Sequence, residues 1–290
     1  MNERIIRRTE ESDSSVVNPD FRNIPDKADD YLEDPVELGT YAAIVQVYER
    51  PAWIVEEQVL RFLDSTVLPK EIYVMQNENY IDISSVLEKW PNIKHLHATN
   101  FNTKFFGRFL IPLALQEEYV ALVDDDVIFG DRWMEVALRK IEQHHAAVSS
   151  WTAVVIQQNL YIPDVHYLQT REEIIGPAFD TETDIFGHWF IFKRNWIHYF
   201  FSLPTATLWT GEDLSFPYLG QELARMRSIS VALDADDPRT CGELFLEEVE
   251  NLQSLASGKV PMSQIVRTAL IRYLVNRNWV LVNQRSHMDI

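Results

Sequence analysis

Three consecutive aspartates are the most distinctive chemical feature of the sequence. Asp124, Asp125 and Asp126 follow the apolar run YVALV at positions 119–123, so a buried strand ends in three like charges. If the strand continues, alternation places Asp124 and Asp126 on one side and Asp125 on the other. Such a pair needs a cation, and hard oxygen donors suit Mg²⁺ or Mn²⁺. The alternative is a simple turn in which Asp131 caps the next helix.

A second acidic pair occurs in the segment TGEDLSF. Gly211 provides a turn that can aim Glu212 and Asp213 into a cleft. The alternative for Asp213 is a helix N-cap.

Two basic residues lie between these acidic features. Lys104 and Arg108 are four positions apart, so an α-helix would place them on one face, where they could reach an anion. The alternative is a solvated helix face. Because the formal net charge is -18, an anionic ligand must be held by such local cations or by a metal, and nucleic acid is not an expected partner.

Composition indicates the class of protein. With 290 residues, 46% of them hydrophobic, the chain can form one large globular core. Cys241 is the only cysteine, which excludes an intrachain disulfide and a thiolate zinc cluster and favours a reducing compartment. No apolar run approaches the ~20 residues of a transmembrane helix. We therefore expect a soluble, cytoplasmic protein without a transmembrane segment, whose oligomeric state is left open.

Strands and helices alternate in the first half of the chain. Apolar runs predict strands at 40–49, 71–76, 92–98 and 119–123, and helical spacing predicts helices at 52–67, 83–90 and 102–118, the last bent near Pro112. This alternation is typical of an α/β protein with a mainly parallel sheet flanked by helices. Sheets of this kind bind ligands beyond the carboxyl ends of their strands, which is where the aspartates lie.

The second half is less regular. Strands are expected within 145–156 and 184–194, and a short aromatic helix at 195–201. A closing helix at 263–279 has Ser263 as a possible cap and an apolar face formed by Ile265, Val266, Ala269, Leu270, Tyr273 and Leu274. The domain prediction is a flexible acidic arm at 1–39, a single α/β domain at 40–245 and a C-terminal helical extension at 246–290.

Taken in order, these features resemble a known family. YVALVDDDVIF, preceded by a strand–helix–strand unit and followed by WTGEDLSF, resembles the DxD and ED pattern of nucleotide-sugar-dependent glycosyltransferases of the GT-A fold. The segments MQNENY (75–80) and ATNFNTKFFGRF (98–109) are similar to those of exostosin-like (family 64) and family-2-type enzymes. The resemblance covers about residues 40–240. It implies a Rossmann-like, mixed and mostly parallel sheet, and metal-dependent transfer of a sugar from a UDP-sugar to a hydroxyl of a glycan or another acceptor.

The resemblance assigns the nucleoside to the ends of the first two strands. Gln46, Tyr48 and Arg50 would flank the uracil, and Asn77 would lie at the base or ribose edge. His188, in the segment DIFGHWFIF, would line the pocket of the donor sugar or the acceptor, although an isolated histidine in an aromatic strand is more often a core residue.

The diphosphate and the metal are assigned to the middle of the chain. Lys104 and Arg108 would contact the diphosphate, and Asp124 would hold the ribose side and the metal. Asp126 would ligate the Mn²⁺ or Mg²⁺ that bridges the two phosphates, and Asp125 would support this site from the other side. A third metal ligand is sought among Asp234, Asp236, Asp237 and His287.

Asp213 is the candidate catalytic base, with Glu212 as the second acid of the pair. In inverting relatives the corresponding aspartate removes the acceptor proton, and in retaining relatives it positions the acceptor, so the stereochemical outcome stays open. Gly187 would allow close approach of the sugar, and Trp189 would line the pocket or pack in the core.

Three alternative readings are weaker. A haloacid-dehalogenase-like phosphotransferase expects its DxD motif after the first strand, whereas Asp124 follows the fourth. A nucleotidyltransferase expects a glycine-rich first loop, and QVYERPAW contains no glycine. A catalytically silent module that binds sugar nucleotides or glycans is also considered, against which the intact acidic residues count.

Overall fold

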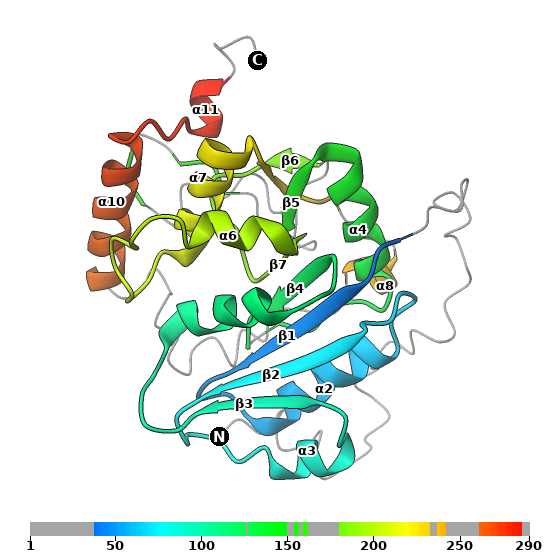
Figure 1. Ribbon diagram of the computed structural model, residues 1–290. Helices are drawn as coiled ribbons and strands as arrows, with labels where there is room; N and C mark the ends of the chain where they lie inside the picture. The colour runs from blue at the N-terminus through cyan, green and yellow to red at the C-terminus, as the bar shows by residue number, and fades with distance from the viewer. Residues whose placement is uncertain are drawn as a thin grey trace, which may run out of the picture.

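The chain forms a mixed eight-stranded sheet flanked by helices. The computed structural model describes residues 38–125, 127–149, 154–156, 159–161, 180–232, 237–241 and 261–285. The strand order is β3-β2-β1-β4-β7-β5-β8-β6 (Figure 1). Strands β1 to β4, β5 and β8 run in one direction, and β6 and β7 run in the opposite direction. The expected α/β architecture with a mostly parallel sheet is therefore confirmed.

The first half of the chain agrees with the predicted order of elements. It contains β1 (Tyr41–Val47), α2 (Ala52–Leu63), β2 (Glu71–Asn77), α3 (Ser84–Lys89), β3 (Lys94–Ala98) and β4 (Tyr119–Val123). Every residue of β1 and β4 is buried, because helices cover both faces of the sheet there. Strand β3 forms an edge of the sheet, and its residues are largely exposed.

The helix before β4 differs from the prediction in type. Residues Lys104–Ala114 form a 3₁₀ helix, η3, with Pro112 near its end. A 3₁₀ helix has about three residues per turn, so residues four apart point roughly 120° apart. Arg108 is accordingly buried and Lys104 is partly exposed. The prediction that the two side chains share one face is wrong.

The second half adds four strands to the sheet. Strands β5 (Ala146–Ser149), β6 (Thr181–Glu182), β7 (Trp189–Lys193) and β8 (Arg227–Ser230) alternate with helical segments. Those segments are α4 (Trp133–His144), η4 (Arg194–Trp196), α6 (Ile197–Phe200), α7 (Glu212–Ala224) and α8 (Pro238–Cys241). Strand β7 pairs antiparallel with both β4 and β5, so it joins the two halves of the sheet.

Alternate strand residues form two hydrophobic cores, one on each face of the sheet. Ala42 and Ile44 of β1 belong to the core that includes residues of η3, α6, α7 and α10 (Pro261–Val275). Tyr41 and Ala43 belong to the core that includes residues of α2 and α4. This period of two explains why the strands read as continuous apolar runs rather than as alternating patterns. No helix in the described ranges is long and apolar enough to cross a membrane.

The closing helix α10 buries a different face from the predicted one. Ile265 and Tyr273 are 63% and 45% exposed, and the buried residues are Ser263, Arg267, Leu270, Ile271 and Leu274. Ser263 lies inside the helix, which includes Pro261 and Met262, so it is not the cap. The face is selected by packing against the start of α7, where a side chain at Gly211 would overlap Leu270. In Figure 1, α10 lies at the left of the molecule and packs against α7.

The segment after α10 forms a strap, residues 276–285, that ends in α11 (Val282–Arg285). Tyr218 Oη donates to the Arg277 carbonyl at 3.1 Å and Gln221 Nε2 to the Val280 carbonyl at 3.2 Å, so the strap is attached to α7. The boundaries 40–245 and 246–290 remain a prediction, but residues 261–285 pack directly on the α/β core.

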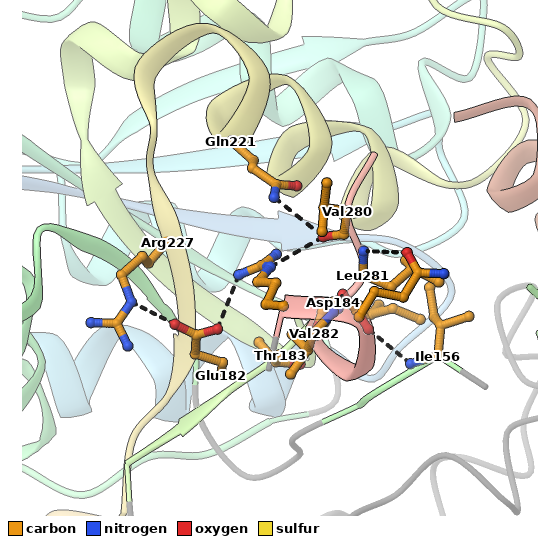
Figure 2. Close-up of polar contacts among 12 residues, drawn as sticks. Ile156, Glu182, Thr183, Asp184, Gln221, Arg227, Val280, Leu281 and Val282 are labelled. Atoms are coloured by element: carbon orange, nitrogen blue, oxygen red, sulfur yellow. Dashed lines mark hydrogen bonds and ion pairs between the residues drawn. The ribbon is translucent and has the colours of Figure 1, made fainter. Parts of the chain in front are cut away.

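A buried aspartate anchors the other end of the strap. Asp184 accepts hydrogen bonds from the backbone N–H groups of Ile156 and Val282, each at 2.9 Å (Figure 2). Beside it, Glu182 accepts from Arg227 at 2.6 Å and from Arg285 at 3.1 Å. Burial raises the pKa of Asp184 to about 6, although both backbone hydrogen bonds oppose this change.

Asp184→Asn is expected to remove a pH-dependent part of the stability. A carboxyl whose pKa is raised in the folded state contributes stability below its unfolded pKa of ~3.9, and this contribution is lost as pH rises through about 6. The contribution is on the order of 3 kcal/mol. As the pH rises from about 4 to about 6, the Tm of the wild type should therefore fall relative to the Tm of Asp184→Asn. Circular dichroism measures both values of Tm. Asp64→Asn, at an exposed position, is the control, and a pH-independent difference for Asp184→Asn would contradict the assignment.

Candidate functional site

Most of the predicted site residues gather at the carboxyl edge of the sheet. Strands β1, β2 and β4 end at Val47, Asn77 and Val123, so the residues that follow them meet at this edge. Strand β7 runs the other way, and its first residue pairs with Val123. This brings His188, which has a φ of 54°, beside Asp124, whose backbone N–H donates to the His188 carbonyl at 2.8 Å.

The aspartates do not continue the strand. Strand β4 ends at Val123 and Asp125 lies in a turn, so strand alternation does not decide where the three carboxylates point. The Asp125 carboxylate lies 3.7 Å from the Nε of Arg50, a side chain that is buried after β1. Asp126 lies outside the described residues.

Gln58 fixes the backbone around the aspartates. Its Nε2 donates to the carbonyls of Asp124 and Val127, both at 2.7 Å, from a fully buried position on α2. Sequence analysis missed this residue. The available signal was a polar side chain at the helical spacing of the buried residues Ile54, Val55, Val59 and Phe62, because a buried amide must find partners.

Arg108 lies at the centre of the site. Its guanidinium is buried and forms ion pairs with Asp124 and, at 3.4 Å, with Glu212. It also lies 5.2 Å from the ring centroid of Phe190. Burial alone would lower the pKa of Arg108, but the carboxylates of Asp124 and Glu212 raise it, so the guanidinium stays charged. Arg108 therefore connects the acid after β4 with the acid that opens α7.

Asp213 pairs with an arginine that sequence analysis did not single out. Arg267 of α10 donates from Nη2 to Asp213 Oδ2 at 2.6 Å and from Nη1 to Thr210 Oγ1 at 3.2 Å. Asp213 lies in the first turn of α7, and Gly211, with a φ of 91°, occupies the cap position. The N-cap alternative for Asp213 is therefore wrong. The acidic residues of this turn still gain from the positive end of the helix dipole.

The two acids of α7 differ in environment. Burial and the neighbouring Asp213 raise the pKa of Glu212, against the lowering effects of Arg108 and Arg267. Glu212 Oε2 and Asp213 Oδ1 are buried and accept no hydrogen bond from the part of the chain that the structure describes. These two oxygens are the free acceptors of the cluster.

The predicted nucleoside residues have different surroundings. Gln46 is buried on the same sheet face as Ile44, and its Oε1 has no partner among the described residues. The ring of Tyr48 meets Tyr80 edge-on, with centroids 5.2 Å apart. Gln46 lies near the end of β1, Tyr48 follows β1, and Tyr80 lies shortly after β2. The three side chains therefore lie near the carboxyl ends of two neighbouring strands.

Asn77 has a structural task. Its Oδ1 accepts from the N–H of Thr103 at 3.0 Å and from its hydroxyl at 2.6 Å, and its Nδ2 donates to the Lys104 carbonyl at 3.4 Å. Because both ends of the buried amide are used in this way, Asn77 holds the start of η3 and thereby positions Lys104 and Arg108.

Several candidates lie apart from the cluster. Trp189 is fully buried and stacks on Trp133 in the core beneath α4, with centroids 3.4 Å apart, so it is a packing residue. Gly187 is partly exposed beside His188. Asp131 is not a cap, because α4 begins without a side-chain cap and the Asp131 carboxylate accepts from Arg239 at 3.2 Å.

No complete metal site is present in the described ranges. Asp237 lies 3.7 Å from Arg132 and accepts from the Arg239 backbone at 3.0 Å, which ties it to α8. Three other candidates, Asp234, Asp236 and His287, lie outside the described residues, as does Asp126. Within the residues that are described, no three His, Cys, Asp or Glu side chains converge to hold an ion.

Comparisons with known proteins identify the fold. No protein-family model and no curated protein matches the chain. Solved structures do match, among them a crystal structure of GalNAc-T7 with UDP, GalNAc and Mn²⁺. The alignment has a TM-score of 0.50 and 11% sequence identity. It covers 67% of this chain and 42% of the GalNAc-T7 chain. At this identity the likeness shows the fold alone: the chain has the GT-A-like α/β fold that the sequence predicts.

Proposed function

We propose that this protein is a metal-dependent glycosyltransferase that moves a sugar from a nucleoside diphosphate, expected to be UDP, to an acceptor hydroxyl. The observation that carries the proposal is the cluster of Asp124, Arg108, Glu212, Asp213 and Arg267 at the carboxyl edge of the sheet. The fold is shared with a protein that has been crystallised with UDP, GalNAc and Mn²⁺. Family 64 or family 2 membership remains a proposal.

The donor half of the site is formed by the ends of β1, β2 and β4. Tyr48 and Gln46 offer a ring and a free buried acceptor for a base. Lys104 remains partly exposed and can approach a diphosphate, whereas Arg108 acts through Asp124. The proposed role of Arg50 is to hold Asp125 beside the donor.

The donor set fits a hard divalent cation. The Asp124 carboxylate is 31% exposed although its partner Arg108 is 2% exposed, so one side of it faces outwards. Asp124 and Asp126 would hold Mn²⁺ or Mg²⁺ through oxygen ligands. The ion, when bound, neutralises the negative charge that develops on the leaving diphosphate.

The acceptor half of the site is Asp213. In an inverting course, Asp213 Oδ1 accepts the proton of the acceptor hydroxyl while the acceptor oxygen bonds to the anomeric carbon and the bond to the diphosphate breaks. In a retaining course, the same oxygen orients the acceptor hydroxyl. Glu212 supports Asp213 from the preceding position, and His188 and Gly187 form the adjacent wall.

Asp126→Ala tests the donor half. Mutation of a residue that hydrogen-bonds to a metal ligand typically lowers metal affinity about 10–100-fold. Loss of the ligand itself should therefore weaken Mn²⁺-dependent UDP binding at least about 10-fold. Isothermal titration calorimetry with UDP, with and without Mn²⁺, measures the effect. Asp64→Ala, at an exposed position on the far end of α2, is the matched control. Undiminished binding by Asp126→Ala would remove this residue from the metal site.

A thermal-shift screen tests the proposal as a whole. Nucleoside diphosphates and their sugars are compared with and without Mn²⁺, because a ligand that binds the folded state raises its Tm. A specific, Mn²⁺-dependent shift with UDP and its sugars, together with transfer to an acceptor, supports the transferase. A shift without transfer indicates a binding module, and no shift with any nucleotide contradicts the proposal.

A further inference from the structure

Arg267 is the only basic residue of the described part of α10 that is buried. Its side chain is 3% exposed, and α10 otherwise places Arg272 in solvent. A buried guanidinium is costly unless it is paired and hydrogen-bonded, and here the pairing is directed at a single carboxylate, that of Asp213, at 2.6 Å. The helix thus delivers one cation to the acceptor side of the site.

Two further contacts fix the direction of this cation. The Arg267 guanidinium lies 4.3 Å from the ring centroid of Tyr161, and its Nη1 donates to Thr210 Oγ1 at 3.2 Å. One turn along the helix, Leu270 packs where a side chain at Gly211 would otherwise lie. The cation and the helix start that bears Asp213 are therefore held in one arrangement.

The pairing distinguishes the two oxygens of Asp213. Oδ2 receives the Arg267 Nη2 hydrogen, while Oδ1 is buried and receives no hydrogen bond from the described residues. A carboxylate that takes a proton from a substrate must be ionised and must present one unshared oxygen. A guanidinium on the other oxygen supplies the second condition, because its hydrogen bond to Oδ2 restricts rotation of the carboxylate.

We propose that Arg267 is a positioning residue for Asp213: it holds Oδ2 and thereby turns Oδ1 towards the acceptor hydroxyl. The C-terminal helix then belongs to the active site rather than to an appendage. The inference rests on the proposed function, since it assigns a role within that reaction. Arg267 itself contacts neither the donor nor the reacting atoms.

The test compares Arg267→Gln, Arg267→Lys and the matched control Arg272→Gln, which changes an exposed arginine of the same helix. For Arg267→Gln we expect kcat to fall about 10–100-fold with the donor KM within about twofold of the wild type. Arg267→Lys keeps a cationic donor for Asp213 Oδ2 and should restore part of kcat, and Arg272→Gln should match the wild type.

The outcomes separate positioning from simple packing. If Arg267→Gln raises the donor KM together with the fall in kcat, or loses Mn²⁺-dependent UDP binding as well, the role is structural and the inference is overturned. Should Arg267→Gln fail to fold, Arg267→Lys decides, and a fall in kcat of more than about 100-fold in this cationic variant contradicts the proposal. A wild-type protein without any transfer activity overturns the proposed function instead, and this inference with it.

Discussion

Asp213→Asn is expected to bind UDP with Mn²⁺ as tightly as the wild type and to lose about 10²–10⁴-fold in kcat. Asparagine has nearly the same shape and keeps an oxygen for Arg267, but its amide cannot take a proton from the acceptor. The loss should therefore appear in kcat, measured by release of UDP with saturating donor and acceptor, and not in the donor KM.

Two comparisons make this expectation specific. Glu222→Gln changes an exposed acid on the same helix and should leave kcat unchanged. Glu212→Gln should have an intermediate effect, because the buried Glu212 supports the cluster through Arg108 without presenting the free oxygen of Asp213. Turnover of Asp213→Asn at the wild-type rate would exclude Asp213 from the catalytic residues.

Arg108→Met is expected to be the most destabilising single change in the site, by about 3–5 kcal/mol. The guanidinium is buried between Asp124 and Glu212, so its removal leaves the Glu212 carboxyl, which is also buried, without its cation. Methionine retains much of the stem that packs against Phe190, which limits the cavity. Equilibrium unfolding in urea measures the loss as a lower midpoint with an unchanged slope.

The second variant in this experiment isolates the charge. Adding Glu212→Gln to Arg108→Met replaces the buried carboxyl that has lost its partner and should recover part of the free energy of unfolding. Arg61→Met, which breaks the pair with Glu57 near the surface of α2, should cost less than about 1 kcal/mol. Equal decreases in the free energy of unfolding for Arg61→Met and Arg108→Met would contradict a larger contribution from the buried ion pairs of Arg108.

The parallel half of the fold could be predicted from the sequence, because strands that are buried on both faces have unbroken apolar sequences. β1 and β4 are buried throughout, and their carboxyl ends place Tyr48 and Asp124 at one edge, as predicted. The helical type of η3 was not readable, since 3₁₀ and α geometry share the same composition over one or two turns. That difference separated Lys104 from Arg108.

The partners of the acids were not readable for a different reason. Arg108 meets Glu212 across 104 positions and Arg267 meets Asp213 across 54, and no local pattern records such pairings. On α10 the hydrophobic pattern favoured a face with Ile265 and Tyr273, whereas packing on Gly211 selected the face that contains Arg267. Polar residues on buried faces, such as Gln58 and Arg267, were the signal that periodicity alone ignores.

The position of α10 in the chain has a consequence for the order in which the site is completed. Translation at ~5–20 residues per second separates the synthesis of Asp213 and Arg267 by roughly 3–10 s, because the two residues are 54 positions apart. When Asp213 has been synthesised, strands β1 to β7, η3 and the start of α7 already exist as chain, but the Asp213 carboxylate still lacks Arg267. A nascent chain is therefore able to pack strands β1 to β4 before α10 docks, and the pairing of Asp213 with Arg267 is completed last.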